Sequence, residues 1–378
     1  MTGGSSAHCW AYLSRVAEPP CAPLLSLVDR VGVVEAAQRV QRGRVDPQLA
    51  AITEARREIN CTAEDLEFLK RRGGRLVTPD DPEWPALAFA GFGGAGLRDS
   101  KQGHAPLALW VIGAVTLGEL AERAVSIVGT RAASPYGEHV AADLAAGLAE
   151  RDTAVVSGGA YGIDGAAHRA VLAVEGVTVA VLAGGLDVLY PAGHSALLHR
   201  VGATGLLISE YPPGVRPARH RFLTRNRLVA ALSGATVVVE AGIRSGAAST
   251  AAWARALGRP VCAVPGPVTS AASIGCHQLL RSGAELVTSA GEVNELIGRS
   301  GEFAEEMVHP VVALDGLTDS ERHVYDALPA RGWYTPESIA VAAGLPVARI
   351  LGPLAVLELT GLVHQQGGSW RLARSSEV

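Results

Sequence analysis

Between residues 124 and 298, short apolar segments alternate regularly with longer stretches that have helical periodicity. The apolar segments end in glycine, serine or an acid, and they lie at residues 124–129, 154–159, 178–185, 206–210, 235–241, 260–266 and 285–289. Such nearly continuous apolar runs are typical of strands that are buried on both faces of a parallel sheet. The alternation therefore predicts an open, doubly wound α/β sheet, whose ligands bind at the carboxyl ends of the strands.

The segments that flank this region predict further structure. Residues 1–70 are helical in pattern, with Gly32 between two apolar stretches, and predict a small domain of helix-hairpin-helix or SAM type. Residues 71–113 are rich in glycine and proline and predict one extra edge strand and a connecting segment. The sheet domain is thus expected over residues 71–298, followed by a short polar linker over residues 299–312.

Residues 313–378 predict a winged-helix domain of three helices and a hairpin. Thr318 and Glu321 form a capping-box pattern, and Thr335-Pro336 is a second helix start. A hairpin is predicted around Gly367-Gly368. The third helix is expected near residues 346–360, where Pro353 predicts a kink or a later start; its apolar face would contain Val347, Ile350, Leu351, Leu354 and Leu357.

Composition limits the compartment and the class of partner. With 48% hydrophobic and 19% charged residues, the chain is expected to fold rather than remain disordered. A net charge of −4 gives no general attraction to nucleic acid, so any basic site must be local. Five widely spaced cysteines fit neither a disulfide framework nor a zinc site and favour a reducing cytoplasm. The sequence shows neither a signal peptide nor a membrane span.

Two glycine-containing motifs follow the first two predicted strands. Gly129, Thr130 and Arg131 could offer a close backbone approach and a guanidinium fork to a phosphate. A tight turn between strand and helix with a surface arginine explains this motif equally well. The segment 157–168 contains Gly158, Gly159 and Gly162, which would expose backbone amides at a helix start. It fits neither the dinucleotide fingerprint nor the phosphate loop, which argues against ATP hydrolysis. Asp164 and His168 are interpreted as ordinary helix residues.

The densest basic segment is residues 216–227, which contains no acid and includes Arg216, Arg219, His220, Arg221, Arg225 and Arg227. With Phe222 among the arginines, it suits a polyanionic backbone and a stacked base. The alternative is a solvated basic loop. Asn226 is expected at a helix start, in a capping or orienting role.

A third group of motifs follows later predicted strands and is expected at the same edge of the sheet. Ser245 and Gly246 begin a run of small residues after Glu240, which allows close approach of a ligand or another chain, although packing alone explains it equally well. Cys276-His277 is no catalytic dyad, because adjacent helix residues point in different directions. We assign no nucleophile, no metal site and no cofactor.

Taken together, these motifs resemble the DNA-processing protein DprA family in order and spacing over about residues 75–298. The resemblance implies an extended Rossmann-like domain that dimerises, binds single-stranded DNA, protects it in natural transformation and loads the recombinase RecA, without a catalytic reaction. The candidate DNA- and phosphate-binding residues are Gly129, Thr130, Arg131, Ser157, Gly158, Gly159, Tyr161, Gly162, Arg221, Phe222, Arg225, Asn226, Arg227, Ser245 and Gly246.

The sequence departs from the family pattern at two places. Tyr161 stands where the family commonly has arginine, and Ala192, Gly193 and His194 follow Tyr190-Pro191 where a polar or basic residue and an asparagine are usual. Both changes remove charge or amide contacts. Tyr161 could replace charge with stacking.

Two other functions compete with DNA binding by the sheet domain. A nucleotide phosphoribohydrolase of the wider Rossmann-like superfamily would carry the string PGGxGTxxE, which is absent here. A transcription-factor role for the C-terminal domain would need a basic surface. That domain has five arginines against seven acids. It is therefore expected to be an accessory or protein-contact domain.

Overall fold

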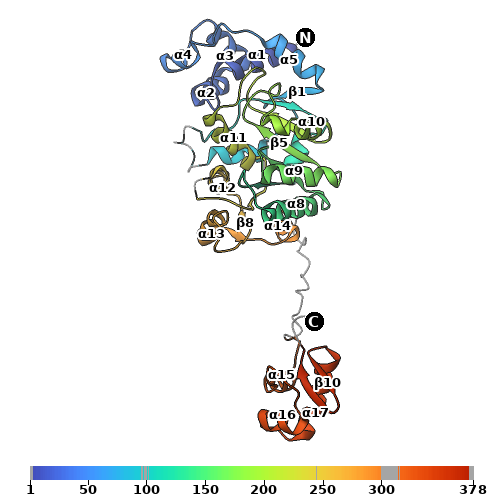
Figure 1. The fold of residues 1–378 in the computed structure, drawn as a ribbon. Coiled ribbons are helices and arrows are strands. Elements are labelled where there is room, and N and C mark those ends of the chain that lie inside the picture. Colours follow the sequence, from blue (N-terminus) through green and yellow to red (C-terminus); the bar gives the residue numbers. More distant parts are fainter. Residues whose placement is uncertain are drawn as a thin grey trace. The chain divides into compact units, whose positions relative to one another are not determined.

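The chain forms two compact units, residues 1–304 and 305–378 (Figure 1). The computed structural model describes residues 3–94, 97, 100, 102–243, 245–298, 314 and 316–373. The predicted linker, residues 299–312, lies outside these ranges.

A nine-stranded sheet forms the centre of the first unit, in the order β1-β2-β6-β5-β4-β3-β7-β8-β9. All seven predicted strands are present: β3 Ala124–Val128, β4 Ala154–Ser157, β5 Thr178–Leu182, β6 Leu206–Ser209, β7 Ala235–Val238, β8 Val261–Ala263 and β9 Glu285–Leu286. These seven pair in parallel, which confirms the prediction of a mostly parallel α/β sheet. The strand order reverses between β3 and β7, and such a switch point opens a crevice for ligands.

Helices cover both faces of the sheet. The helices are α8 Pro135–Ala149, α9 Ile163–Ala173, α10 Ser195–Thr204, α11 Arg219–Ala231, α12 Gly246–Ala256, α13 Ile274–Arg281 and α14 Ala290–Ile297. Val125 and Ile127 pack on α8, α9 and α14, whereas Ala124 and Val128 belong to the core that contains α11, α12 and α13. Successive strand residues point to opposite faces, so one apolar strand serves both cores.

The sheet is extended by two antiparallel strands, β1 Gly74–Val77 and β2 Leu109–Ile112, with α6 Ala86–Phe89, η1 Ala90–Gly93 and α7 Leu117–Glu122 near them in sequence. β2 pairs with β6, and β1 pairs with β2 as the edge. The prediction of a single edge strand here is therefore wrong. The two strands are separated by more than thirty residues, so no hairpin signal announced their pairing.

The N-terminal region is helical, as expected: α1 Gly3–Val16, α2 Ala22–Val31, α3 Val33–Gln41, α4 Pro47–Thr53 and α5 Thr62–Arg71. Gly32 separates α2 from α3 with a φ of +78°, which glycine adopts without a steric penalty. These helices have their own apolar cluster. They also pack on the sheet, because Ala11 and Leu69 share a core with Trp110. The domain boundary at residue 70 stays a prediction.

The second unit contains α15 Asp319–Asp326, α16 Pro336–Ala343, α17 Val347–Leu359 and the hairpin strands β10 Val363–Gln366 and β11 Ser369–Leu372. The capping box at Thr318 and the cap at Thr335 are both present. Gly367 and Gly368 form the hairpin turn with positive φ angles.

Two details of α17 differ from expectation. The helix begins at Val347 and contains Pro353, so the alternative of a later start is wrong. Ile350, Leu354 and Leu357 form the buried stripe of the helix. Leu351 follows Ile350 and points away from this stripe, so its side chain is 47% exposed, contrary to the prediction that it belongs to the apolar face. In the described part of the chain, no single helix is long and apolar enough to cross a membrane. Among the described helices, the bent pair of α16 and α17 reaches that length and apolar composition when the two are taken together.

Candidate functional site

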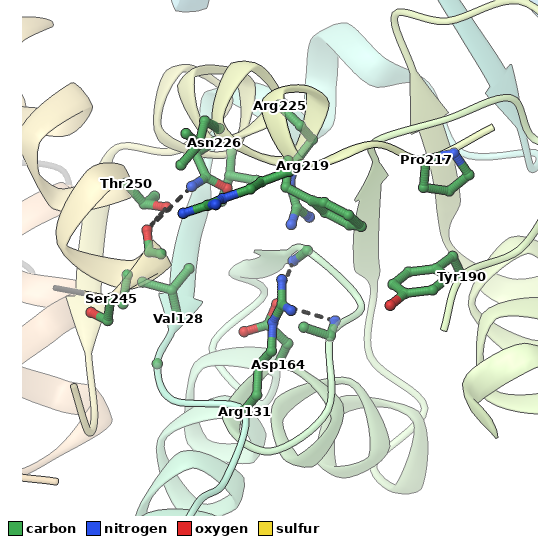
Figure 2. Close-up of a pocket in the computed structure, with 18 of the residues that line it drawn as sticks. Val128, Arg131, Asp164, Tyr190, Pro217, Arg219, Arg225, Asn226, Ser245 and Thr250 are labelled. Carbon is green, nitrogen blue, oxygen red and sulfur yellow. Dashed lines mark hydrogen bonds between the residues drawn. The ribbon is translucent and has the colours of Figure 1, made fainter. Parts of the chain in front are cut away.

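A cavity of about 880 Å³ opens at the carboxyl ends of the central strands, beside the switch point (Figure 2). It is lined by the loop after β3, the loop after β4, the segments before and within α11, and the start of α12. Nine of the predicted residues lie on its wall: Gly129, Thr130, Arg131, Gly158, Phe222, Arg225, Asn226, Ser245 and Gly246. The remaining six do not line it.

Cationic and aromatic side chains form one wall. The Arg131 guanidinium lies 5.4 Å from the centroid of the Phe222 ring. The Phe222 ring in turn packs against Tyr190, with ring centroids 5.5 Å apart. Arg216 and Arg219 line the same cavity and are exposed. The wall thus offers guanidinium groups to phosphates and an aromatic face to a base, the combination typical of single-strand binding.

The floor is a buried pair of opposite charges, Asp164 and Arg225. Asp164 accepts hydrogen bonds from the backbone amides of Gly158 (3.1 Å) and Ala160 (3.3 Å), drawn as dashed lines in Figure 2. Arg225 donates to the Val181 carbonyl oxygen at 2.6 Å. Burial raises the pKa of Asp164, while Arg225 and the two amides oppose that shift.

These contacts change the interpretation of the glycine segment. The Gly158 amide is bound to Asp164 and is not offered to a ligand, contrary to expectation. A Cβ atom at position 158 would lie 1.9 Å from Nη1 of Arg225. Glycine is therefore required here to make room for the arginine. Asp164, interpreted from the sequence as an ordinary helix charge, organises the loop.

Glu240 holds the loop that carries Arg131. Its side chain is buried and accepts hydrogen bonds from the Ser134 hydroxyl (2.6 Å) and the Ser134 amide (2.9 Å). Its backbone carbonyl accepts from the Thr130 amide at 2.7 Å. Glu240 is not among the residues that line the cavity. It is therefore a structural support for the loop and is not placed to act as a general acid or base.

The basic cluster does not form one surface. Arg227 is 0% exposed, and its Nη2 contacts both carboxylate oxygens of Glu210 at 2.5 and 2.6 Å. Its guanidinium also lies 5.3 Å from the Phe92 ring centroid. Arg225 and Arg227 are two residues apart on α11, and such residues point in different directions. The structure thus places Arg227 in the core and gives no support to its prediction as a DNA contact.

Asn226 lies in the middle of α11, so its predicted position at a helix start is wrong. Its amide donates to the Gly246 carbonyl oxygen at 3.2 Å. Ser245 caps α12, because its hydroxyl accepts from the Ala248 amide. Asn226 therefore orients the start of α12 against the cavity, in agreement with the expected orienting role.

Tyr161 and His194, at the two departures from the family pattern, pack against each other with ring centroids 4.7 Å apart. A Cβ atom at Gly193 would lie 2.5 Å from the Tyr161 hydroxyl oxygen. The two departures are thus one packed unit outside the cavity wall. Stacking of Tyr161 on DNA stays a prediction.

The other predicted residues outside the cavity make contacts or form turns within the protein itself. The Ser157 hydroxyl donates to the Ile127 carbonyl oxygen, and Arg221 pairs with Glu18. Gly159 and Gly162 have positive φ angles in the turn before α9. His168 is buried against Thr178, and burial lowers its pKa to about 3. It is therefore a neutral core residue, whereas the sequence alone indicated only an ordinary helix residue.

Sequence reasoning missed several lining residues. Tyr190, Pro217 and Thr250 lie on the wall. Tyr190 lies in the loop that follows β5, and an aromatic residue in a loop after a strand is the sequence signal that could have identified it. Among the described residues, no group of three His, Cys, Asp or Glu side chains could hold a metal ion.

Comparisons with known proteins identify relatives. The family model described as DNA recombination-mediator protein A matches residues 75–298. The chain is 67% identical over 370 residues to a Mycobacterium tuberculosis protein provisionally named DNA processing protein DprA, covering 98% of this chain and 95% of that one. It is 37% identical over 265 residues to protein Smf of Escherichia coli, covering 67% and 69%.

Among solved structures, the DNA processing protein A of Streptococcus pneumoniae superposes with a TM-score of 0.62 at 30% identity. The match covers 76% of this chain and 95% of that one. Its extent shows that the sheet and its flanking helices follow the same fold.

Proposed function

The chain belongs to the DNA recombination-mediator protein A family, and on this premise we propose that it binds single-stranded DNA, protects it and loads the RecA recombinase during natural transformation, in the cytoplasm. One observation carries the DNA-binding part. Among the described residues, four arginines and a single carboxylate line the cavity, in a protein of net charge −4, and the carboxylate is buried beside Arg225. The aromatic pair Tyr190 and Phe222 supplies a stacking surface beside those cations.

The direct test is binding of a labelled single-stranded oligonucleotide, measured by fluorescence anisotropy at several salt concentrations. Phosphate contacts release counterions, so the logarithm of the association constant should fall linearly with the logarithm of salt concentration. Binding that does not change between low and physiological salt would exclude phosphate recognition.

RecA loading rests on the family's description as a recombination mediator. Its test is assembly of RecA on single strands already covered by a single-strand-binding protein. The chain should shorten the lag before RecA hydrolyses ATP. An unchanged lag, with DNA binding intact, would remove this part of the proposal.

The enzyme alternative receives no support from Glu240 or Asp164, whose carboxylates hold backbone groups in place. We propose that the chain turns over no nucleotide. Incubation with ATP or nucleoside monophosphates should leave them intact. Release of phosphate or free base, abolished by Asp164→Asn, would favour the phosphoribohydrolase function instead.

We further propose that two copies associate through the edge of the sheet at β9. Both β9 residues are exposed, and Leu286 is 55% exposed. In the described part of the chain, β9 is the last strand of the sheet, whereas the opposite edge strand β1 packs against α5. An open strand edge is a surface at which another chain can pair.

Leu286→Glu is therefore expected to convert a dimer into a monomer, because it places a charge at the contact. Sedimentation velocity measures the change. Leu359→Glu, at an 88% exposed position in the second unit, is the matched control and should leave the dimer intact. A dimer that survives Leu286→Glu would place the interface elsewhere.

The second unit, three helices and a hairpin, supports our proposal that it is a winged-helix domain. Its third helix offers Arg349 against Glu358, and its remaining exposed face is apolar, with Leu351, Val356 and Leu359. A helix of this composition is poorly suited to contact phosphates.

Deletion after residue 300 should therefore leave the affinity for single strands unchanged or slightly raised. Anisotropy on single-stranded, duplex and junction oligonucleotides tests this expectation. A tenfold loss on single strands, about 1.4 kcal/mol, would contradict it. A loss confined to junctions would instead indicate that Arg371 and Arg374 bind duplex DNA there. Arg374 lies outside the described residues.

A further inference from the structure

The carboxylate of Glu18, in the turn between α1 and α2, is surrounded by three basic side chains from two distant parts of the chain. Arg221 contacts it through Nε (2.6 Å) and Nη2 (3.1 Å), and Arg56 through Nη2 (2.8 Å). The His220 ring nitrogen lies 3.3 Å away. We call Glu18, Arg56, His220 and Arg221 the Glu18 cluster.

The Glu18 cluster is adjacent to the DNA cavity along α11. Arg219 lines the cavity, and the next two residues, His220 and Arg221, contact Glu18. Arg221 also donates to the carbonyl oxygen of Arg216, at 2.5 Å, and Arg216 lines the cavity. The Glu18 cluster is therefore in direct contact with the segment that lines the cavity.

The arrangement around Glu18 matches what a phosphate requires. Guanidinium groups donate in a fork that fits carboxylate and phosphate oxygens alike. Most of the site is open to solvent: the side chains of Glu18, Arg56 and His220 are 33%, 37% and 63% exposed, whereas that of Arg221 is 15% exposed. A phosphate that replaces the Glu18 carboxylate would accept hydrogen bonds from the same donors, so these donors would stay paired.

Glu18 is an anion under all physiological conditions. Burial alone would raise its pKa, but the hydrogen bonds from Arg221 and Arg56 lower the pKa of this carboxyl to about 2. It therefore competes with any incoming anion for the same donors.

We propose that the Glu18 cluster is a second phosphate site for bound single-stranded DNA, and that Glu18 occupies it in the free protein until a backbone phosphate displaces it. The inference rests on the proposed DNA-binding function. It makes the N-terminal helical region part of the DNA path, because Arg56 belongs to that region and does not line the cavity.

The test compares Glu18→Gln with the wild-type chain, using oligonucleotides of about four and about sixteen nucleotides. The variant should bind the longer strand about fivefold more tightly with an unchanged log–log salt slope, since the same phosphate contact forms without competition from the Glu18 carboxylate. The shorter strand, which only fills the cavity, should show no gain. Glu35→Gln is the matched control: it removes the same charge from an exposed carboxylate that pairs with Arg39 on the same helix.

Arg56→Gln gives an independent measurement. Alone, it should weaken binding of the longer strand and flatten its salt slope by about 0.7; combined with Glu18→Gln, it should cancel the gain. Thermal unfolding of each variant checks that the fold is intact.

The inference is overturned if Glu18→Gln lowers or does not change the affinity, or if both strand lengths or Glu35→Gln gain equally. Any of these results with tight wild-type binding leaves the proposed function standing. A wild-type chain that binds no single strand would contradict the proposed function itself.

Discussion

Arg227→Met is expected to lower the free energy of unfolding of the first unit by about 3–5 kcal/mol, the usual cost of removing one partner of a buried ion pair. Arg227 is fully buried and Glu210 is 3% exposed. Without Arg227, the Glu210 carboxylate remains in the core with no opposite charge. Burial already raises the pKa of Glu210, and Arg227 is the group that opposes this shift.

Urea denaturation followed by circular dichroism measures the effect. Arg219→Met, an exposed position on the same helix, is the matched control and should change stability by less than about 0.5 kcal/mol. The double variant Arg227→Met with Glu210→Met should recover much of the loss, because it removes both charges. If Arg227→Met and Arg219→Met have the same free energy of unfolding, the Arg227–Glu210 ion pair does not stabilise the fold.

The contrast between Arg225 and Arg227 shows what the sequence could not reveal. Both belong to the same acid-free basic segment, so charge counting assigned them the same role. Their roles differ because the helix turns by about 100° per residue, which directs one side chain to the cavity floor and the other towards Glu210. Glu210 lies seventeen residues earlier in the chain, and no local pattern pairs the two.

The parallel strands, in contrast, could be predicted because their signal is local in the sequence. A strand buried on both faces leaves a nearly continuous apolar run in the sequence, and each predicted run ends one to three residues beyond its strand. The location of the cavity follows from the same rule. The pairing of β1 with β2 and the contacts of Glu18 join residues far apart in the sequence, and such contacts depend on the assembled fold.

The Asp164 site is an intermediate case. The sequence showed glycines after a strand, and the general expectation was that they expose amides to a ligand. In the fold, Gly158 is small because Arg225 lies against it, and Asp164 binds its amide. The glycine motif thus identified the correct loop, but it did not show that the Gly158 amide is bound by Asp164 instead of a ligand.

Arg131→Ala is expected to weaken binding of single-stranded DNA about ten- to a hundredfold, as expected for loss of a charge-assisted contact of about 1.5–3 kcal/mol. It should also flatten the log–log salt slope by about 0.7, because one fewer phosphate is neutralised. Arg131 is exposed on the cavity wall. Arg227→Met, in contrast, should leave the slope unchanged wherever the protein is folded.

Anisotropy titrations at four or more salt concentrations separate these effects. Arg200→Ala removes the same charge from an exposed position on α10 outside the cavity wall, and it controls for net charge. Tyr190→Ala removes an aromatic face, so it should lower affinity by about 1–3 kcal/mol without changing the slope. If Arg131→Ala leaves the slope unchanged while Arg200→Ala flattens it, the DNA backbone follows another surface, and the cavity would not be the phosphate site.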